Sequence, residues 1–162
     1  AKKLANSNDA PIFDRGVVYS CKQELNNPLA STLLHMKPID LDEKLSLFND
    51  HWSPRIIASV NGHDVKLAKF CGAFDWHSHG DADEMFVVLK GSFTMEFRDH
   101  SVELSVGQMI VVPRGVEHRP VAEAECSVML VEPAGLLNTG DGEESDRTTS
   151  GTWIDNDDPA SD

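Results

Sequence analysis

The sequence predicts an all-β domain, either a sandwich or a barrel, and three observations support this prediction. From residue 56 onward, apolar residues recur with the period of two that is typical of half-buried strands. Seven or more short runs of this kind follow one another, and Gly, Pro or Asp separates almost every pair. The runs lie too close together to leave room for crossover helices, which excludes a parallel α/β fold.

The first two strands are expected to form a hairpin. Residues 56–60 and 63–70 have strand patterns, and Asn61-Gly62 between them is the favoured two-residue turn. Further strands are expected, in chain order, at residues 74–79, 84–89, 92–97, 101–104, 108–112, 117–122 and 126–132.

One short helix is expected before the strands. Asp40 can cap its first turn, and Glu43 follows at the spacing of a capping box. Leu45 and Phe48 then fall on one face, as in an amphipathic helix. The pattern predicts a helix at about residues 41–49.

The chain divides into an N-terminal arm or extension (1–38), a barrel domain (39–137) and an acidic tail (138–162). The arm is weakly patterned, with Asn-rich turns between short apolar pieces. The tail holds eight acids and one base, and we expect residues 138–150 to be flexible because few apolar groups are available to offset ordering entropy. Trp153 and Ile154 are the exception, and we expect them to dock on the outside of the barrel.

Composition and charge narrow the choice of partners. The 162 residues are 40% hydrophobic and 25% charged, as in one soluble globular domain with a core. The formal charge is −13, and no cluster of Lys and Arg offsets it, so neither nucleic acid nor an anionic membrane is an expected partner. The sequence has no stretch of 18 apolar residues, so we expect no transmembrane segment.

The cysteines indicate a reducing compartment. Cys21, Cys71 and Cys126 are odd in number, far apart and in no C-x-x-C pair. We therefore expect three free thiols in the cytoplasm and no thiolate metal site.

The stretch WHSHGDADEM carries the chemistry. In a strand, His77 and His79 point to the same face, and Glu84 can face both imidazoles if the strands 74–79 and 84–90 pair. A second strand and turn, GQMIVVPRGVEHRPV, can return His118 to the same cavity. Two histidines one residue apart are by themselves more often a surface pair, but their combination with Glu84 and His118 favours a metal site.

These residues resemble the two motifs of the cupin superfamily. The first motif is G-x5-H-x-H-x3,4-E-x6-G, and His77, His79, Glu84 and Gly91 fit it, while Gly72 lies one residue too close. The second motif is G-x5-P-x-G-x2-H-x3-N, and Gly107, Pro113, Gly115 and His118 fit it, while Ala122 replaces the final Asn. Eight of ten fixed positions therefore match, within a resemblance that covers about residues 39–137.

The resemblance implies a jelly-roll barrel, or double-stranded β-helix, in which His77, His79, Glu84 and His118 hold a metal. Asp83 is the competing carboxylate, but it would point to the opposite face of its strand, so Glu84 is preferred. Three imidazoles and one carboxylate suit one divalent Fe, Mn, Ni, Zn or Cu ion per chain. An octahedral ion would keep two positions open, so the catalytic group would be a metal-bound water or the substrate itself.

Other candidate residues have a structural interpretation beside the functional one. By alternation, six residues are candidates for the barrel lining and the substrate pocket: Phe86, Met95, Phe97, Met109, Val111 and Met129. Four histidines are expected at the surface: His35, His51, His63 and His100. Arg98, Arg114 and Arg119 can receive an anionic substrate, although exposed arginine is the more common outcome.

The function expected is that of a small metalloenzyme, an oxygenase, isomerase or lyase acting on an oxygen-rich small molecule. The alternative is a metal-dependent binding or sensing module without turnover. The chain is similar to small bacterial single-domain cupins loosely labelled mannose-6-phosphate isomerase-like, but it has no basic phosphate-binding cluster. Its single tyrosine, Tyr19, lies in the arm, which argues against lyases that use a pocket tyrosine. Cupins of this size are usually dimers, so a homodimer is expected.

Overall fold

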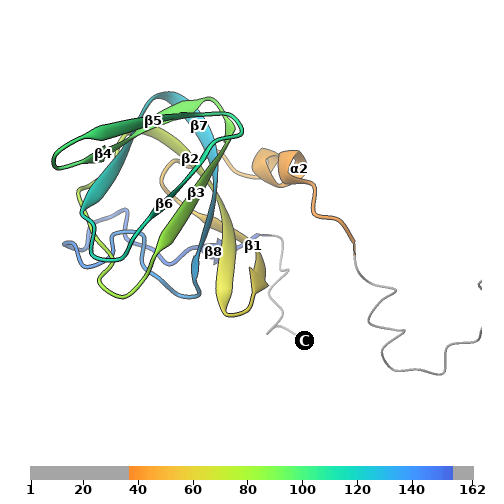
Figure 1. Cartoon of the computed structure of the whole chain (residues 1–162). Helices are drawn as coiled ribbons and strands as arrows, with labels where there is room; N and C mark the ends of the chain where they lie inside the picture. The colour runs from red at the N-terminus through yellow and green to blue at the C-terminus, as the bar shows by residue number, and fades with distance from the viewer. Residues whose placement is uncertain (1–36, 155–162) are drawn as a thin grey trace, which may run out of the picture. The chain divides into compact units, whose positions relative to one another are not determined.

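Antiparallel pairing rolls the strands into a barrel, as Figure 1 shows. The computed structural model describes residues 37–154, within a compact unit that begins at Pro38. The all-β jelly-roll barrel with a short N-terminal helix is confirmed. In chain order the elements are α2 (Leu41–Ser46), β1 (Arg55–Val60), β2 (His63–Ala73), β3 (Glu84–Lys90), β4 (Ser92–Phe97), β5 (Ser101–Ser105), β6 (Met109–Val112), β7 (His118–Pro133) and β8 (Thr152–Trp153).

The long strand β7 organises the sheet. One edge of β7 pairs with β2 along most of its length. Its other edge is shared, because the N-terminal part pairs with β4 and the C-terminal part pairs with β3. β3 continues the sheet to β6, and β4 continues it to β5. This single strand therefore connects both halves of the barrel.

The predicted hairpin is confirmed, and two of the later strands are joined into one. β1 and β2 form the expected hairpin, and Asn61 and Gly62 both have positive φ angles, 51° and 74°, as a type I′ turn requires. The two strands expected at 117–122 and 126–132 are one continuous strand, because β2 pairs with both parts and a register shift between Phe70 and Gly72 absorbs the irregularity.

The strand expected at 74–79 is wrong, and so is its pairing with residues 84–90. This segment makes only one isolated bridge, between His77 and His118, while β3 pairs with β6 and β7. The carbonyl of Asp75 bonds to the ring of His77 within the segment, and the carbonyls of Ser78 and His79 accept hydrogen bonds from other loops, so the segment forms no ladder.

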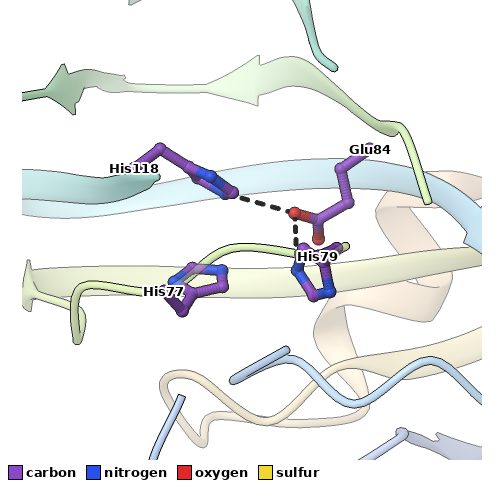
Figure 2. A group of neighbouring side chains, drawn as sticks. All are labelled: His77, His79, Glu84 and His118. Carbon is purple, nitrogen blue, oxygen red and sulfur yellow. Dashed lines mark ion pairs between the residues drawn. The ribbon is translucent and has the colours of Figure 1, made fainter. Parts of the chain in front are cut away.

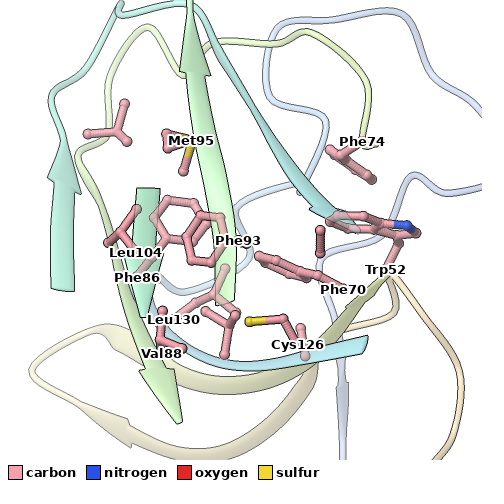
Figure 3. Packing of buried hydrophobic residues seen from close by; sticks show 14 residues of the cluster. Trp52, Phe70, Phe74, Phe86, Val88, Phe93, Met95, Leu104, Cys126 and Leu130 are labelled. Atoms are coloured by element: carbon pink, nitrogen blue, oxygen red, sulfur yellow. The ribbon is translucent and has the colours of Figure 1, made fainter. Parts of the chain in front are cut away.

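The main core fills the barrel with aromatic side chains, which Figure 3 shows from close by. Trp52 stacks on Phe70, with ring centroids 4.5 Å apart, and Phe93 meets Phe70 edge to face at 5.5 Å. Phe86 and Met95, two of the predicted lining residues, are buried in this cluster, and Phe97 packs against it half-buried.

The alternation prediction fails for β6 and for one residue of β7. Met109 and Val111 are 55% and 49% exposed, so they lie on the outer face instead of lining the barrel. Ile110 and Val112 take the inward positions, because β6 enters the sheet one residue out of the expected phase. Met129 packs into a second cluster on the other side of the sheet.

Helix α2 covers this second cluster. Its N-terminus is capped by Asp40, whose Oδ1 accepts hydrogen bonds from the backbone N–H groups of Asp42 and Glu43 at 3.0 and 3.1 Å. The helix ends at Ser46, earlier than expected, yet Leu45 and Phe48 are both buried. The second cluster contains Leu45, Phe48, Ile57, Leu67 and Ile154.

No helix among residues 37–154 is long and apolar enough to cross a membrane.

The C-terminal segment, defined here as residues 138–154, is hydrogen-bonded to the rest of the domain at several points, although residues 141–147 are exposed. Hydrogen bonds of Asn138, Thr139 and Thr149 connect the segment to itself, and the flexibility expected at 138–150 stays a prediction. Docking of the final pair is confirmed. β8 pairs in parallel with β1, and Ile154 is 6% exposed, whereas Trp153 stays half-buried.

Replacing Ile154 with Ala should lower the free energy of unfolding by about 2–4 kcal/mol, because it removes a buried side chain from the second cluster. Urea denaturation measures this change. The matched control is Val60→Ala on the neighbouring strand, where a 53% exposed side chain should change stability by only about 0.5 kcal/mol. Equal losses in the two variants would mean that Ile154 does not anchor the segment.

Candidate metal centre

Two backbone hydrogen bonds place His77 beside His118. The N–H of His77 donates to the carbonyl of His118 at 3.1 Å, and the N–H of His118 donates to the carbonyl of His77 at 2.9 Å. His118 is the first residue of β7, so this bridge joins the loop after β2 to the start of the central strand. The two imidazole centroids lie 4.3 Å apart as a result.

Backbone carbonyls fix the orientation of both rings. The Nδ1 of His77 lies 2.9 Å from the carbonyl oxygen of Asp75, and the Nδ1 of His118 lies 2.9 Å from that of Val116. Since a carbonyl can only accept, each Nδ1 carries a proton, and in the neutral ring the lone pair is therefore on Nε2. This is the tautomer that a metal ligand needs, and the carbonyls are its outer support.

Glu84 brings the carboxylate from the first residue of β3. Its Oε2 lies 3.1 Å from the Nε2 of His79 and 3.2 Å from the Nε2 of His118, as the dashed lines in Figure 2 mark. Burial raises the pKa of Glu84, but the contacts with His118 and His79 outweigh it and hold the pKa well below its ordinary value. The side chain is therefore a carboxylate at neutral pH.

The four side chains form one buried group of metal-ligand type. His77, His79, Glu84 and His118 each offer a ligand atom, and these atoms all lie within 4.8 Å of one another. Both ring nitrogens of His79, the Nε2 of His118 and the Oε2 of Glu84 are buried and have no hydrogen-bond partner in the described part of the chain. Because buried polar atoms are normally paired, these atoms fit a bound cation that takes the place of hydrogen bonds.

His77, the first of the four residues along the chain, is neutral at pH 7. Burial, followed by repulsion from His118, lowers the pKa of His77 to about 4. A metal can therefore bind His77 without displacing a proton at neutral pH.

The C-terminal segment lies directly over His79. The N–H of Asp141 donates to the carbonyl of Ser78 at 2.8 Å, and Asp141 Oδ2 accepts from the N–H of Gly80 at 2.7 Å. Gly140, with φ +53°, sits so close that a Cβ there would lie 2.0 Å from the carbonyl oxygen of Ser78 and 2.9 Å from the Nδ1 of His79. Only glycine fits at this position.

A small, mostly apolar cavity borders the group. It measures about 30 Å³ and touches His77 and Glu84. Its remaining walls are Trp52, Pro54, Phe70, Phe74, Phe86, Pro120, Leu130 and Asn138. Trp52 has a left-handed backbone, φ 58°, which is rare for a large residue, and its indole N–H donates to the carbonyl of Cys71 at 2.9 Å. This hydrogen bond and the stacking on Phe70 hold the indole in the cavity wall.

Behind Glu84 lies a buried ion pair that the sequence analysis missed. Lys66 Nζ donates to Glu132 Oε1 at 2.5 Å, and the two side chains are 1% and 2% exposed. Burial and the nearby charge of Glu84 raise the pKa of Glu132, and Lys66 opposes this shift. A sequence signal existed, because Lys66 and Glu132 are charged residues at inward positions of two strands that alternate in period two.

The structure keeps the remaining candidates away from the group. Asp83 is exposed and accepts a hydrogen bond from the N–H of Arg114 at 2.9 Å, which lowers the pKa of Asp83. Three histidines expected at the surface, His51, His63 and His100, are exposed, and His35 lies outside the described residues. Cys71 and Cys126 are unpaired, as expected, and Cys21 and Tyr19 also lie outside the described residues.

Two of the arginines are engaged by glutamates. Arg98 forms a two-pronged pair with Glu117 at 2.6 Å for each contact, and Arg119 donates to Glu96 at 2.6 Å. Both guanidinium groups lie over the ring of Trp76, 3.9 and 4.9 Å from its centroid. Trp76 is therefore half-buried under these arginines and does not join the main core with Phe74.

Comparisons with known proteins identify the proteins to which this chain is similar. A family model described as "Cupin domain" matches residues 60–132. A cupin-2 domain containing protein from Shewanella frigidimarina is 49% identical, with a TM-score of 0.58, over 59% of this chain and 93% of that one. Protein NMB1881 from Neisseria meningitidis is 35% identical, with a TM-score of 0.56, over 60% of this chain and 99% of that one.

A curated relative, the uncharacterized protein YdbB of Bacillus subtilis, is 42% identical over 64 residues. This match covers 39% of the chain and 57% of YdbB, so the chain spans little more than half of that relative.

Gly140→Ala should destabilise the protein by clearly more than the roughly 1–2 kcal/mol that a left-handed alanine costs, because the added Cβ also meets the Ser78 carbonyl. Gly135→Ala is the matched control, since Gly135 has φ +80° but an added methyl group there would have no atom within 4 Å. Urea denaturation of both variants gives the comparison. Losses of equal size would show that the contact with Ser78 is not tight.

Proposed function

Because this chain belongs to the cupin superfamily, we propose that it is a metalloprotein that holds one divalent transition metal per chain and acts as a small metalloenzyme. The reaction class is that of an oxygenase, isomerase or lyase, with an oxygen-rich small molecule as substrate. The observation that carries this proposal is the buried group His77, His79, Glu84 and His118, whose ligand atoms converge. Among residues 37–154, no hydrogen-bond partner is found for the ring nitrogens of His79, the Nε2 of His118 or the Oε2 of Glu84.

The donor set narrows the choice of metal. Three imidazole nitrogens and one carboxylate oxygen suit divalent Fe, Mn, Ni, Zn or Cu, and leave open positions on an ion that prefers six ligands. Such an ion, when bound, supplies Lewis acidity and a water of lowered pKa. The chain's own residues supply the setting: carbonyls fix the rings of His77 and His118, and the carboxylate of Glu84 offsets the charge of the cation.

The cavity indicates how a substrate would meet the centre. Its polar wall consists of His77, Glu84 and Asn138, and aromatic and aliphatic side chains form the rest. A substrate would direct an oxygen atom toward the polar wall and an apolar part toward the aromatic rings. At about 30 Å³ this cavity holds little more than one water molecule, whereas a second pocket of about 440 Å³, lined in part by Asp75, Thr139 and Gly142, also borders His77 and has room for a larger molecule.

The small cavity also favours a second candidate function, a metal-dependent binding or sensing module without turnover. Such a module needs to admit only a small ligand or a single donor group. Incubation of the metal-loaded protein with a ligand distinguishes the two functions. A compound that raises the melting temperature and is recovered unchanged supports the binding module, whereas conversion of the compound supports the enzyme.

The proposal includes the cytoplasm as location, on the ground of the unpaired Cys71 and Cys126, and cell fractionation tests it.

The proposal also includes a homodimer. Strand β6 pairs only with β3, and its residues Met109 and Val111 are half-exposed apolar side chains on an open face. Light scattering should give twice the chain mass of 17.8 kDa, and a mass of one chain would contradict the dimer.

Substitution of either His79 or His118 by Ala should remove most of the bound metal and lower the melting temperature of the loaded protein, because a ligand that binds only the folded state stabilises it. Elemental analysis of protein purified without chelators or a nickel column measures the metal. His63→Ala, at an exposed position, is the matched control and should keep the wild-type content. Full occupancy in the first two variants would rule out this metal centre.

A further inference from the structure

A buried ion pair is an unusual feature for a barrel interior. Taking Lys66 and Glu132 out of water costs free energy, and an apolar pair of similar volume is often as stable or more stable. A contribution to stability is therefore a weak explanation for the presence of this ion pair. Its position in the fold suggests another one.

The Lys66–Glu132 pair is next to Glu84, the carboxylate of the candidate metal centre. The ladder between β3 and β7 pairs Phe86 with Leu130 and Met85 with Val131, so the next two residues, Glu84 and Glu132, face each other across the strands. Both side chains are buried, on the same inward face as the core residues Phe86 and Leu130. Lys66 reaches Glu132 from β2, on the far edge of β7.

One oxygen of Glu132 is held and the other is not. Oε1 accepts the hydrogen bond from Lys66, whereas Oε2 is buried without a hydrogen-bond partner in the described structure. Lys66 is fixed in turn by the carbonyl oxygen of Ser150, which accepts a second hydrogen bond from Nζ at 2.7 Å. The ammonium group of Lys66 thus connects Ser150, in the C-terminal segment, to Glu132, and Glu132 faces Glu84.

We propose that Glu132, held in place by Lys66, is a positioning residue that sets the orientation of the Glu84 carboxylate in the metal centre. The inference rests on the proposed function, because it assigns a role toward the metal that the four ligands would bind. Glu132 is not itself a ligand, since it lies outside the group of converging ligand atoms.

The arrangement of charges supports this role. A divalent cation would face the carboxylate of Glu84, with Glu132 behind it and the ammonium of Lys66 behind that. Lys66 holds Glu132 in one place, and Glu132 lies opposite Glu84 across the strands, so loss of the Lys66–Glu132 pair should let the Glu84 side chain change its orientation. Groups of this kind behind metal ligands typically change metal affinity by about 10–100-fold.

The test measures Co(II) binding to the full chain by competition with a chelator, together with the visible absorption spectrum of bound Co(II). Glu132→Gln keeps the side-chain length and an oxygen that can accept from Lys66, but removes the charge. We expect roughly 10–100-fold weaker Co(II) binding and a changed spectrum. Glu123→Gln, at an exposed position on the same strand, is the matched control and should match the wild type.

A second variant keeps the inference falsifiable if Glu132→Gln folds poorly. Lys66→Met with Glu132→Leu replaces the pair with apolar side chains of similar size, which the interior should accept. A folded double variant with weak Co(II) binding supports the positioning role. Wild-type affinity and spectrum in either variant overturn it, whatever happens to stability. Failure of the wild-type protein to bind Co(II) would instead overturn the proposed metal function, and this inference with it.

Discussion

The backbone bridge between His77 and His118 is the junction on which the candidate metal centre depends. It joins a loop with no regular pairing to the first residue of β7, the strand that both halves of the barrel share. Since β7 also carries Glu132 and faces Glu84 on β3, one strand sets the position of most polar groups in the interior. Loss of the bridge would therefore affect ring orientation before it affected the fold.

The centre concentrates polar groups where the barrel is otherwise aromatic. Phe70, Phe86 and Phe93 pack together in the main core, and the histidines lie beyond one end of this cluster, with Phe74 in edge contact with His77. Low polarity on that side strengthens every electrostatic contact of the centre. In the same surroundings, a histidine nitrogen without a hydrogen-bond partner costs free energy. Backbone carbonyls and the C-terminal segment, on the side of the centre away from the aromatic rings, supply contacts to these histidines.

The sequence predicted the fold class and the four converging side chains, because period-two patterns and fixed motif spacings are local signals. It placed residues 74–79 in a strand, although their hydrogen bonds go to the start of β7 and to two loops farther along the chain, and no local pattern contains that information. It also assigned Met109 to the interior, because a phase error of one residue inverts a short strand. Lys66 and Glu132 were missed for a related reason, since their partnership crosses from β2 to β7 and appears only when the two strands are side by side.

The segment that covers the centre lies outside the part of the chain that defines the family. The family model ends at residue 132, and all four ligands lie within it, whereas Gly140 and Ser150 come later. Trp52, which closes the cavity from another side, comes before the family match begins. Recombination between related barrels at those boundaries would thus exchange the whole ligand set and leave its enclosure behind. In this chain the candidate ligands and the residues that enclose them therefore lie in separate stretches of the sequence.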